Sequence, residues 1–224
     1  MALLEIACFN VDSALAAGQA GADRVELCDR ADVGGITPPS SWIADLREKI
    51  EIPIHAMVRP RGGDFVYSPD EFQEMKDTIT GLKAIADGFV FGILKPDRTV
   101  DAARTSELVE LAAPLPCTFH RAFDETTDLP RALEDVVGCG IRTILTSGGV
   151  SNAFQNCDVL ALLVKQAGGR VVVMPGGGVR STNIEELKRR TNALVFHSSA
   201  LVAEQKVADV AEIRQMKVIL QPKS

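Results

Sequence analysis

The sequence predicts a single domain, residues 1–224, folded as a (β/α)8 TIM-type barrel. Eight short runs rich in Val, Ile and Leu alternate with longer helical patterns, which is typical of a parallel sheet covered by helices. The length of 224 residues fits one barrel. An open doubly wound sheet is the alternative, but it usually has fewer strands, and no G-x-G-x-x-G fingerprint follows the first run.

The expected strands are mainly apolar runs separated by turn residues and helical patterns. In chain order they cover residues 3–8, 23–28, 52–58, 87–94, 115–120, 142–147, 170–175 and 193–198.

Helix-capping residues precede several of the segments between these runs. A final helix over about residues 207–219 would close the ring. The caps are Asp12 and Ser13, the run from Ser68 to Glu71, Asp101, and the run from Ser181 to Asn183.

Alternation within the strands separates side chains that face the lumen from those that face the helices. The apolar residues of strand 23–28 turn Glu26 and Cys28 inward, and Glu5 is a second lumen carboxylate. A buried carboxylate needs a cation or a raised pKa, and Arg59 is the expected cation. A structural Arg–Glu pair and a general acid or base remain equally open.

All three histidines of the chain fall on inward positions. His120 and His197 lie at strand ends, where barrel active sites are found, and are candidates for exchanging protons together with Glu26. His55 lies mid-strand and is expected to be a neutral core imidazole. Asp124 is expected to orient a histidine or to accept from Arg121.

Two glycine-containing loops predict an anion site. Arg59 and Arg61, with two glycines after them, offer guanidinium groups for a phosphate or carboxylate. Gly176, Gly177 and Gly178 follow the seventh run, and Ser198 and Ser199 end the eighth, where barrels commonly hold phosphate. The segment 146–149 is expected to border the same pocket.

Composition excludes several classes of function. The net charge is −6, and no basic run suggests nucleic acid as a partner. No apolar stretch is long enough to cross a membrane, and the N-terminal residues lack a signal-peptide pattern, so a cytoplasmic location is expected. Five cysteines at irregular spacing argue against a disulfide framework or a structural zinc site. No organic cofactor is expected.

Several motifs together resemble the CutC copper-homeostasis protein family over nearly the whole chain. The resemblance implies a cytoplasmic barrel that associates with itself, with a dimer as the first expectation, and that is linked to copper. The matching stretches are GADRVELC (21–28), GGITP (34–38), RPRGGDFVYS (59–68), TFHRAFD (118–124), ILTSGG (144–149), VVMPGGGV (172–179) and FHSSA (196–200).

The resemblance also implies Cys8 and Cys28 as a Cu(I) site, and thiolates suit this soft ion. Strand alternation opposes the pair, because Cys28 faces the lumen whereas Cys8 shares its side with Leu4 and Ile6.

Two functions therefore remain open at the level of sequence. The first is copper homeostasis with bound Cu(I), which follows the resemblance. The alternative is a barrel enzyme that acts on a small phosphorylated or carboxylated metabolite at the C-terminal ends of the strands, which the inward polar residues favour.

Overall fold

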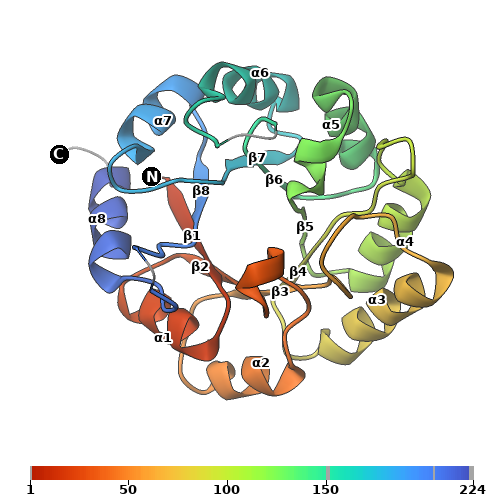
Figure 1. Cartoon of the computed structure of the whole chain (residues 1–224), viewed down its shortest axis with the longest axis horizontal. Helices are drawn as coiled ribbons and strands as arrows, with labels where there is room; N and C mark the ends of the chain where they lie inside the picture. The colour runs from red at the N-terminus through yellow and green to blue at the C-terminus, as the bar shows by residue number, and fades with distance from the viewer. Residues whose placement is uncertain (1, 150–151, 204, 222–224) are drawn as a thin grey trace.

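Eight parallel strands form the centre of the molecule and confirm the predicted barrel (Figure 1). The structure is a computed structural model that describes residues 2–149, 152–203 and 205–221. The strands are β1 (Leu3–Cys8), β2 (Arg24–Leu27), β3 (Ile54–Met57), β4 (Gly88–Phe91), β5 (Cys117–Phe119), β6 (Thr143–Thr146), β7 (Val172–Pro175) and β8 (Val195–Ser198).

Seven of the eight expected strands are shorter than the sequence pattern predicts. Pro53 and Pro116 directly precede β3 and β5, and proline has no amide hydrogen to donate to a ladder. The first strand has the predicted bounds, Leu3–Cys8.

The ladders run in the order β7-β6-β5-β4-β3-β2-β1-β8. In the register, Ile6 pairs with Val25, and Glu26 pairs with His55. The two end strands β7 and β8 lie side by side, as Figure 1 shows, and complete the ring without a backbone ladder in the described part of the chain. The barrel is therefore nearly closed.

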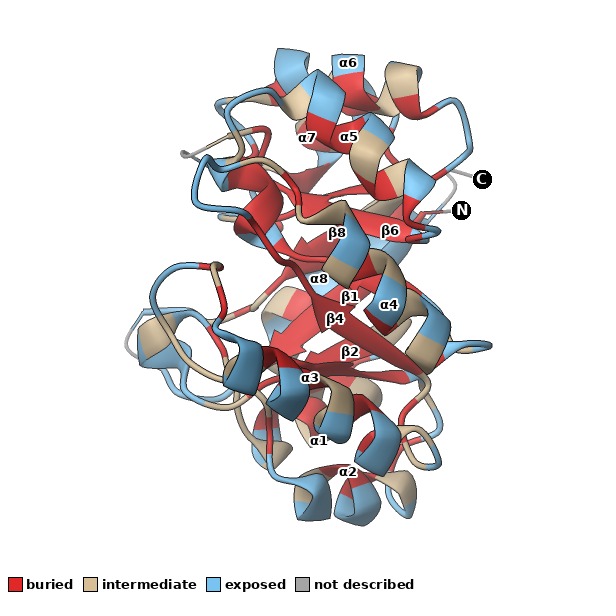
Figure 2. Cartoon of the chain, turned by 90° about the vertical axis from the view of Figure 1, so that its right-hand side faces the viewer, coloured by how far each residue is buried: buried red, intermediate tan, exposed pale blue. Residues whose placement is uncertain are grey.

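Helices surround the strands, with their exposed faces outward and the strands buried inside (Figure 2). They are α1 (Val11–Gln19), α2 (Ser40–Arg47), α3 (Pro69–Leu82), α4 (Ala102–Ala112), α5 (Leu129–Gly138), α6 (Cys157–Ala167), α7 (Ile184–Thr191) and α8 (Val210–Leu220), with short 3-10 helices η1 (Ala31–Val33) and η2 (Arg121–Glu125).

Capping side chains fix several helix starts. Ser68 and Glu71 form a reciprocal capping box at α3. The closing helix begins at residue 210 rather than at the expected 207, because the Asp209 side chain accepts the Glu212 N–H. None of the described helices is long and apolar enough to cross a membrane.

Glycines on one strand make room for two histidines in the lumen. A Cβ atom at Gly88 would lie 2.6 Å from His55 Nε2, and one at Gly92 would lie 2.6 Å from His120 Nδ1. Any side chain at either position would therefore collide with an imidazole ring. The lumen accommodates these rings because Gly88, on β4, and Gly92, directly after it, have no side chain beside them.

Candidate functional site

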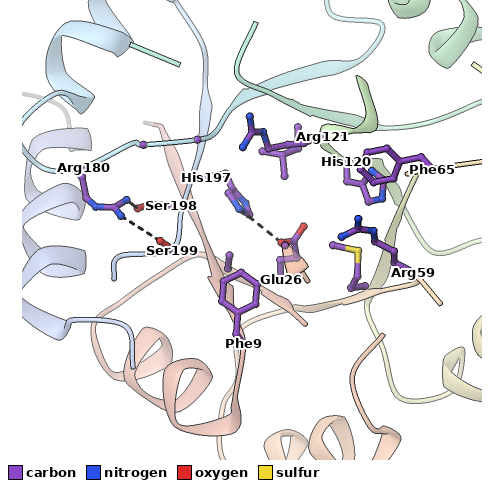
Figure 3. A pocket seen from close by; sticks show the side chains of 16 residues that line it. Phe9, Glu26, Arg59, Phe65, His120, Arg121, Arg180, His197, Ser198 and Ser199 are labelled. Carbon is purple, nitrogen blue, oxygen red and sulfur yellow. Dashed lines mark hydrogen bonds and ion pairs between the residues drawn. The ribbon is translucent and has the colours of Figure 1, made fainter. Parts of the chain in front are cut away.

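A cavity of about 240 Å³ opens at the C-terminal ends of the strands (Figure 3). This upper pocket has polar side chains from several strands and the loops that follow them, which is the usual place for a barrel site. Its polar and aromatic lining comprises Phe9, Glu26, Arg59, Phe65, His120, Arg121, Arg180, His197, Ser198 and Ser199.

Two carboxylates and one imidazole meet at the base of the upper pocket. His197 Nδ1 lies 2.7 Å from Glu5 Oε1, and His197 Nε2 lies 3.8 Å from Glu26 Oε2. All three residues are buried, and their ligand atoms lie within 4.8 Å of one another. Glu26 Oε1 is buried without a hydrogen-bond partner among the described residues.

The cation that compensates these carboxylates is Arg24, so the expectation that Arg59 does so is wrong. Arg24 Nε donates to Glu5 Oε2 at 2.5 Å. Arg24 stands two residues before Glu26 on β2 and faces the same way. The alternation that turned Glu26 inward could therefore have identified Arg24 as well.

The protonation of the three groups follows from their surroundings. Burial opposes ionisation of Glu5, but Arg24 and His197 outweigh burial and lower the Glu5 pKa to about 2. Burial raises the pKa of Glu26, and the neighbouring Glu5 charge raises it further. Burial opposes a charge on His197, but Glu26 and then Glu5 raise its pKa. Since Glu5 is ionised and can only accept, Nδ1 of His197 carries the proton that joins them.

The two candidate copper ligands lie on opposite sides of the sheet, as the alternation predicts. Cys8 packs in the main core between strands and helices. Cys28 packs in the lumen with Met57 and Val90, and its Sγ lies 3.6 Å from Glu26 Oε2. Burial, followed by the Glu26 charge, raises the pKa of both thiols. The two thiols therefore pack in different clusters, and Cys28 stands beside Glu26.

The expected two-arginine clamp after β3 is also not formed. Arg59 lines the upper pocket, but its Nη1 donates to the carbonyls of Val33 and Gly35, and its Nη2 donates to that of Gly63. Arg61 is absent from the pocket lining and donates to Glu71. The guanidinium groups do not converge because each satisfies acceptors in its own surroundings.

The loops after β7 and β8 contribute to the pocket as expected, with two differences. Gly177, Gly178, Ser198 and Ser199 line it. Gly176 is not part of the pocket lining, and a Cβ atom added to it would lie 2.4 Å from the Leu145 side chain. The segment 146–149 does not line the pocket, because the Asp124 carboxylate accepts from Thr146 and Ser147 and ties this segment to η2.

The three histidines divide between the two ends of the barrel. His120 and His197 line the upper pocket, whereas His55 lines a separate cavity of about 310 Å³ at the N-terminal ends of the strands. Burial lowers the pKa of His55 to about 4, so it is a neutral lumen imidazole, as expected. Its Nδ1 has no partner among the described residues.

Two pocket arginines were not singled out as ligand-binding residues from the sequence. Arg121 stands on η2, and its Nε donates to Asp124. Of the two roles expected for Asp124, orienting a histidine or accepting from Arg121, the structure shows the second. Arg180 follows the Gly176–Gly178 run. It donates to the carbonyls of Val179 and Leu201, to Ser198 Oγ at 3.2 Å and to Ser199 Oγ at 3.4 Å. Their positions in loops that follow the C-terminal ends of β5 and β7 were the available signal.

Comparison with known proteins identifies the family. The CutC family profile matches residues 2–202. The chain belongs to the CutC family. A CutC protein of Xylella fastidiosa is 47% identical over 198 residues, which are 88% of this chain and 74% of the relative. The copper homeostasis protein cutC homolog of Homo sapiens is 42% identical over 199 residues, which are 88% of this chain and 73% of that protein.

Solved structures agree with the CutC fold. A CutC protein from Streptococcus agalactiae matches with a TM-score of 0.83 and 32% identity, covering 89% of this chain and 99% of that chain. A phosphoribosyl anthranilate isomerase from Thermococcus kodakaraensis matches with a TM-score of 0.67 over the full length of both chains. At 17% identity, the second likeness shows the barrel fold alone.

Proposed function

We propose that this CutC-family protein acts in copper homeostasis by binding a copper ion inside its barrel, with Cys28, Glu26 and His197 as ligands. The name of the human relative, a copper homeostasis protein, supports the role. We place the protein in the reducing cytoplasm, where thiols stay reduced. The ion there is Cu(I), the soft state that thiolates select.

One observation carries the proposal: the Glu26 carboxylate has a sulfur ligand on one neighbour and a nitrogen ligand on another. Glu26 Oε2 lies 3.6 Å from Cys28 Sγ and 3.8 Å from His197 Nε2. Metal–ligand bonds of about 2.0–2.3 Å in a tetrahedral site place ligand atoms roughly 3.3–3.7 Å apart. Both distances from Glu26 Oε2 are close to this range.

The surroundings of these ligands support the same assignment. Glu26 Oε1 is buried and has no partner among the described residues, so it has a free lone pair for a cation. His197 donates its Nδ1 proton to Glu5, which leaves Nε2 toward Glu26. A carboxylate behind a ligating histidine is the usual way in which proteins orient the ring toward a metal.

Two cysteine variants test the proposal. Reduced wild-type protein, Cys28→Ser and the matched control Cys8→Ser are titrated with Cu(I) against a colorimetric chelator, and circular dichroism checks that each is folded. We expect one ion per chain in the wild type, unchanged affinity within about threefold in Cys8→Ser, and at least tenfold weaker binding in Cys28→Ser. His197→Gln should weaken binding similarly.

The outcomes separate the alternatives. Equal loss in both cysteine variants would support the paired Cys8 and Cys28 site and contradict the lumen site. Unchanged binding in Cys28→Ser and His197→Gln would place the ion elsewhere. The alternative that the protein is a barrel enzyme stays a prediction, and so does the self-association that the family resemblance implies.

A further inference from the structure

The wall of the upper pocket contains a hydrogen-bond donor that the protein does not satisfy. His120 Nδ1 accepts the Ala122 N–H at 3.2 Å, so the proton of the neutral ring is on Nε2. Burial and then Arg59 lower the His120 pKa to about 3, which keeps the ring neutral. Nε2 is buried without a partner among the described residues, and His120 lines the pocket. A buried N–H of this kind calls for an acceptor from outside.

Arg121 presents a guanidinium group that is fixed from behind. Its Nε donates to Asp124 Oδ2 at 2.8 Å and its Nη2 to Ser147 Oγ at 3.0 Å. Asp124 is itself held by Thr146 Oγ1 and by the Ser147 N–H. Because the side chain is 44% exposed and lines the pocket, its remaining donors are available at low entropic cost.

Arg180 approaches the same segment from the other side. Figure 3 shows Arg121 and Arg180 toward opposite ends of the backbone segment that leads from β7, with His197 on the side of Arg121. Gly177 and Gly178 lie in this backbone with φ of 93° and 74°, in the left-handed region. A Cβ at Gly177 would lie 3.3 Å from Arg121 Cζ, so the glycine allows close approach of the guanidinium.

We infer that the upper pocket binds a small organic oxyanion, a metabolite carrying a phosphate or carboxylate group. The oxyanion accepts from Arg121 beside Gly177–Gly178, Arg180 contributes a second positive charge to the pocket, and a second acceptor oxygen meets His120 Nε2. Three arginines and one glutamate line the pocket, which favours an anion over a neutral or cationic ligand. This inference goes beyond the copper role and does not depend on it.

The size of the pocket limits the ligand. Its volume of about 240 Å³ equals the liquid volume of roughly eight water molecules. The ligand is therefore a short-chain metabolite with about ten non-hydrogen atoms rather than a nucleotide.

Metal-free protein tests the inference. Isothermal titration and thermal shift would use inorganic phosphate, glycerol 3-phosphate and malonate as probes, with glycerol as the uncharged control. We expect saturable binding of at least one anion and none of glycerol, and the phosphate and malonate arms distinguish the two oxyanions. Arg121→Met should weaken binding at least tenfold, whereas Arg214→Met, an exposed arginine on α8, should not change it.

The test separates this inference from the copper proposal. Cys28→Ser should still bind the anion, and Arg121→Met should still bind Cu(I). If no anionic probe binds saturably, or if Arg121→Met binds as the wild type does, the oxyanion site is wrong whatever the copper titration gives. Equal loss in Arg214→Met and Arg121→Met would indicate nonspecific charge attraction and would also overturn it.

Discussion

The loop after β3 and the loop after β7 look alike in sequence but differ in the structure. Both combine arginine with consecutive glycines at the C-terminal end of a strand. In the first loop, Arg59 is 5% exposed and donates to three backbone carbonyls. In the second, Arg180 donates to the carbonyls of Val179 and Leu201, and also to two hydroxyl groups that line the pocket. An arginine next to glycines therefore reaches the side chains of the pocket only where backbone carbonyls leave some of its donors free.

In the β3 loop, Arg59 therefore has a structural role, and the set of contacts that it makes is called the Arg59 clip below. Arg59 joins the segment around η1 to the loop containing Gly63, and its Cζ lies 4.8 Å from the centre of the Phe65 ring. Phe65 in turn lies 4.8 Å from the His120 ring. These contacts order one wall of the pocket, so Arg59 contributes to the site by positioning the side chains around it.

The largest expected effect comes from removing the Arg59 clip. Arg59→Ala should lower the free energy of unfolding by about 2–4 kcal/mol, because it removes three charge-assisted hydrogen bonds and leaves the buried Gly35 carbonyl without a donor. Arg61→Ala is the control, since its ion pairs are partly exposed and should cost less than about 1 kcal/mol. Urea denaturation measures both. Equal free energies of unfolding in the two variants would contradict a larger stabilising role for Arg59 than for Arg61.

A smaller effect should follow from acidification. His120 has a pKa of about 3 in the fold against an ordinary 6.5, so the unfolded chain binds the proton first. The contribution of neutral His120 to the free energy of unfolding is complete above pH 6.5 and is lost as the pH falls toward 3. Between pH 7.5 and 5 the loss should be about 2 kcal/mol. His120→Gln should show a correspondingly shallower fall in urea titrations at the two pH values, and an unchanged slope would contradict a neutral buried His120.

The smallest expected effect compares one glycine from each loop. Gly63 has φ of 86° and Gly177 has φ of 93°, so alanine at either should cost about 1–2 kcal/mol of strain. Only Gly177→Ala places a methyl group 3.3 Å from Arg121 Cζ. Thermal unfolding should therefore show similar destabilisation, while phosphate binding should fall only in Gly177→Ala. If both variants bind phosphate with the same affinity, Gly177 is not part of the anion site.

Strand alternation made much of the lumen predictable. It placed Glu26 and Cys28 inside and Cys8 outside, because a period of two leaves no other choice once the apolar face is known. The same rule also turns Arg24 toward the lumen, where it donates to Glu5, although the motif at Arg59 is the more conspicuous source of a cation in the sequence.

The loops were less predictable, because no periodicity fixes where a loop side chain points. Arg61 turns to Glu71, and segment 146–149 turns to Asp124, through hydrogen bonds between residues far apart in sequence. Arg121 and Arg180 reach the pocket by the same kind of long-range contact. Their role depended on partners that a one-dimensional pattern does not identify.

The junction between β7 and β8 has a dynamic consequence. Seven backbone ladders join the eight strands in the described part of the chain, and this last junction relies on side chains such as Ser198, which donates to the Val179 carbonyl at 2.7 Å. Such a junction should open in local fluctuations before the laddered ones, and amide hydrogen exchange should be fastest there. A ligand held by Arg121 beside Gly177–Gly178 would fix the loop that leads from β7 to this junction, so occupancy would slow exchange there more than elsewhere.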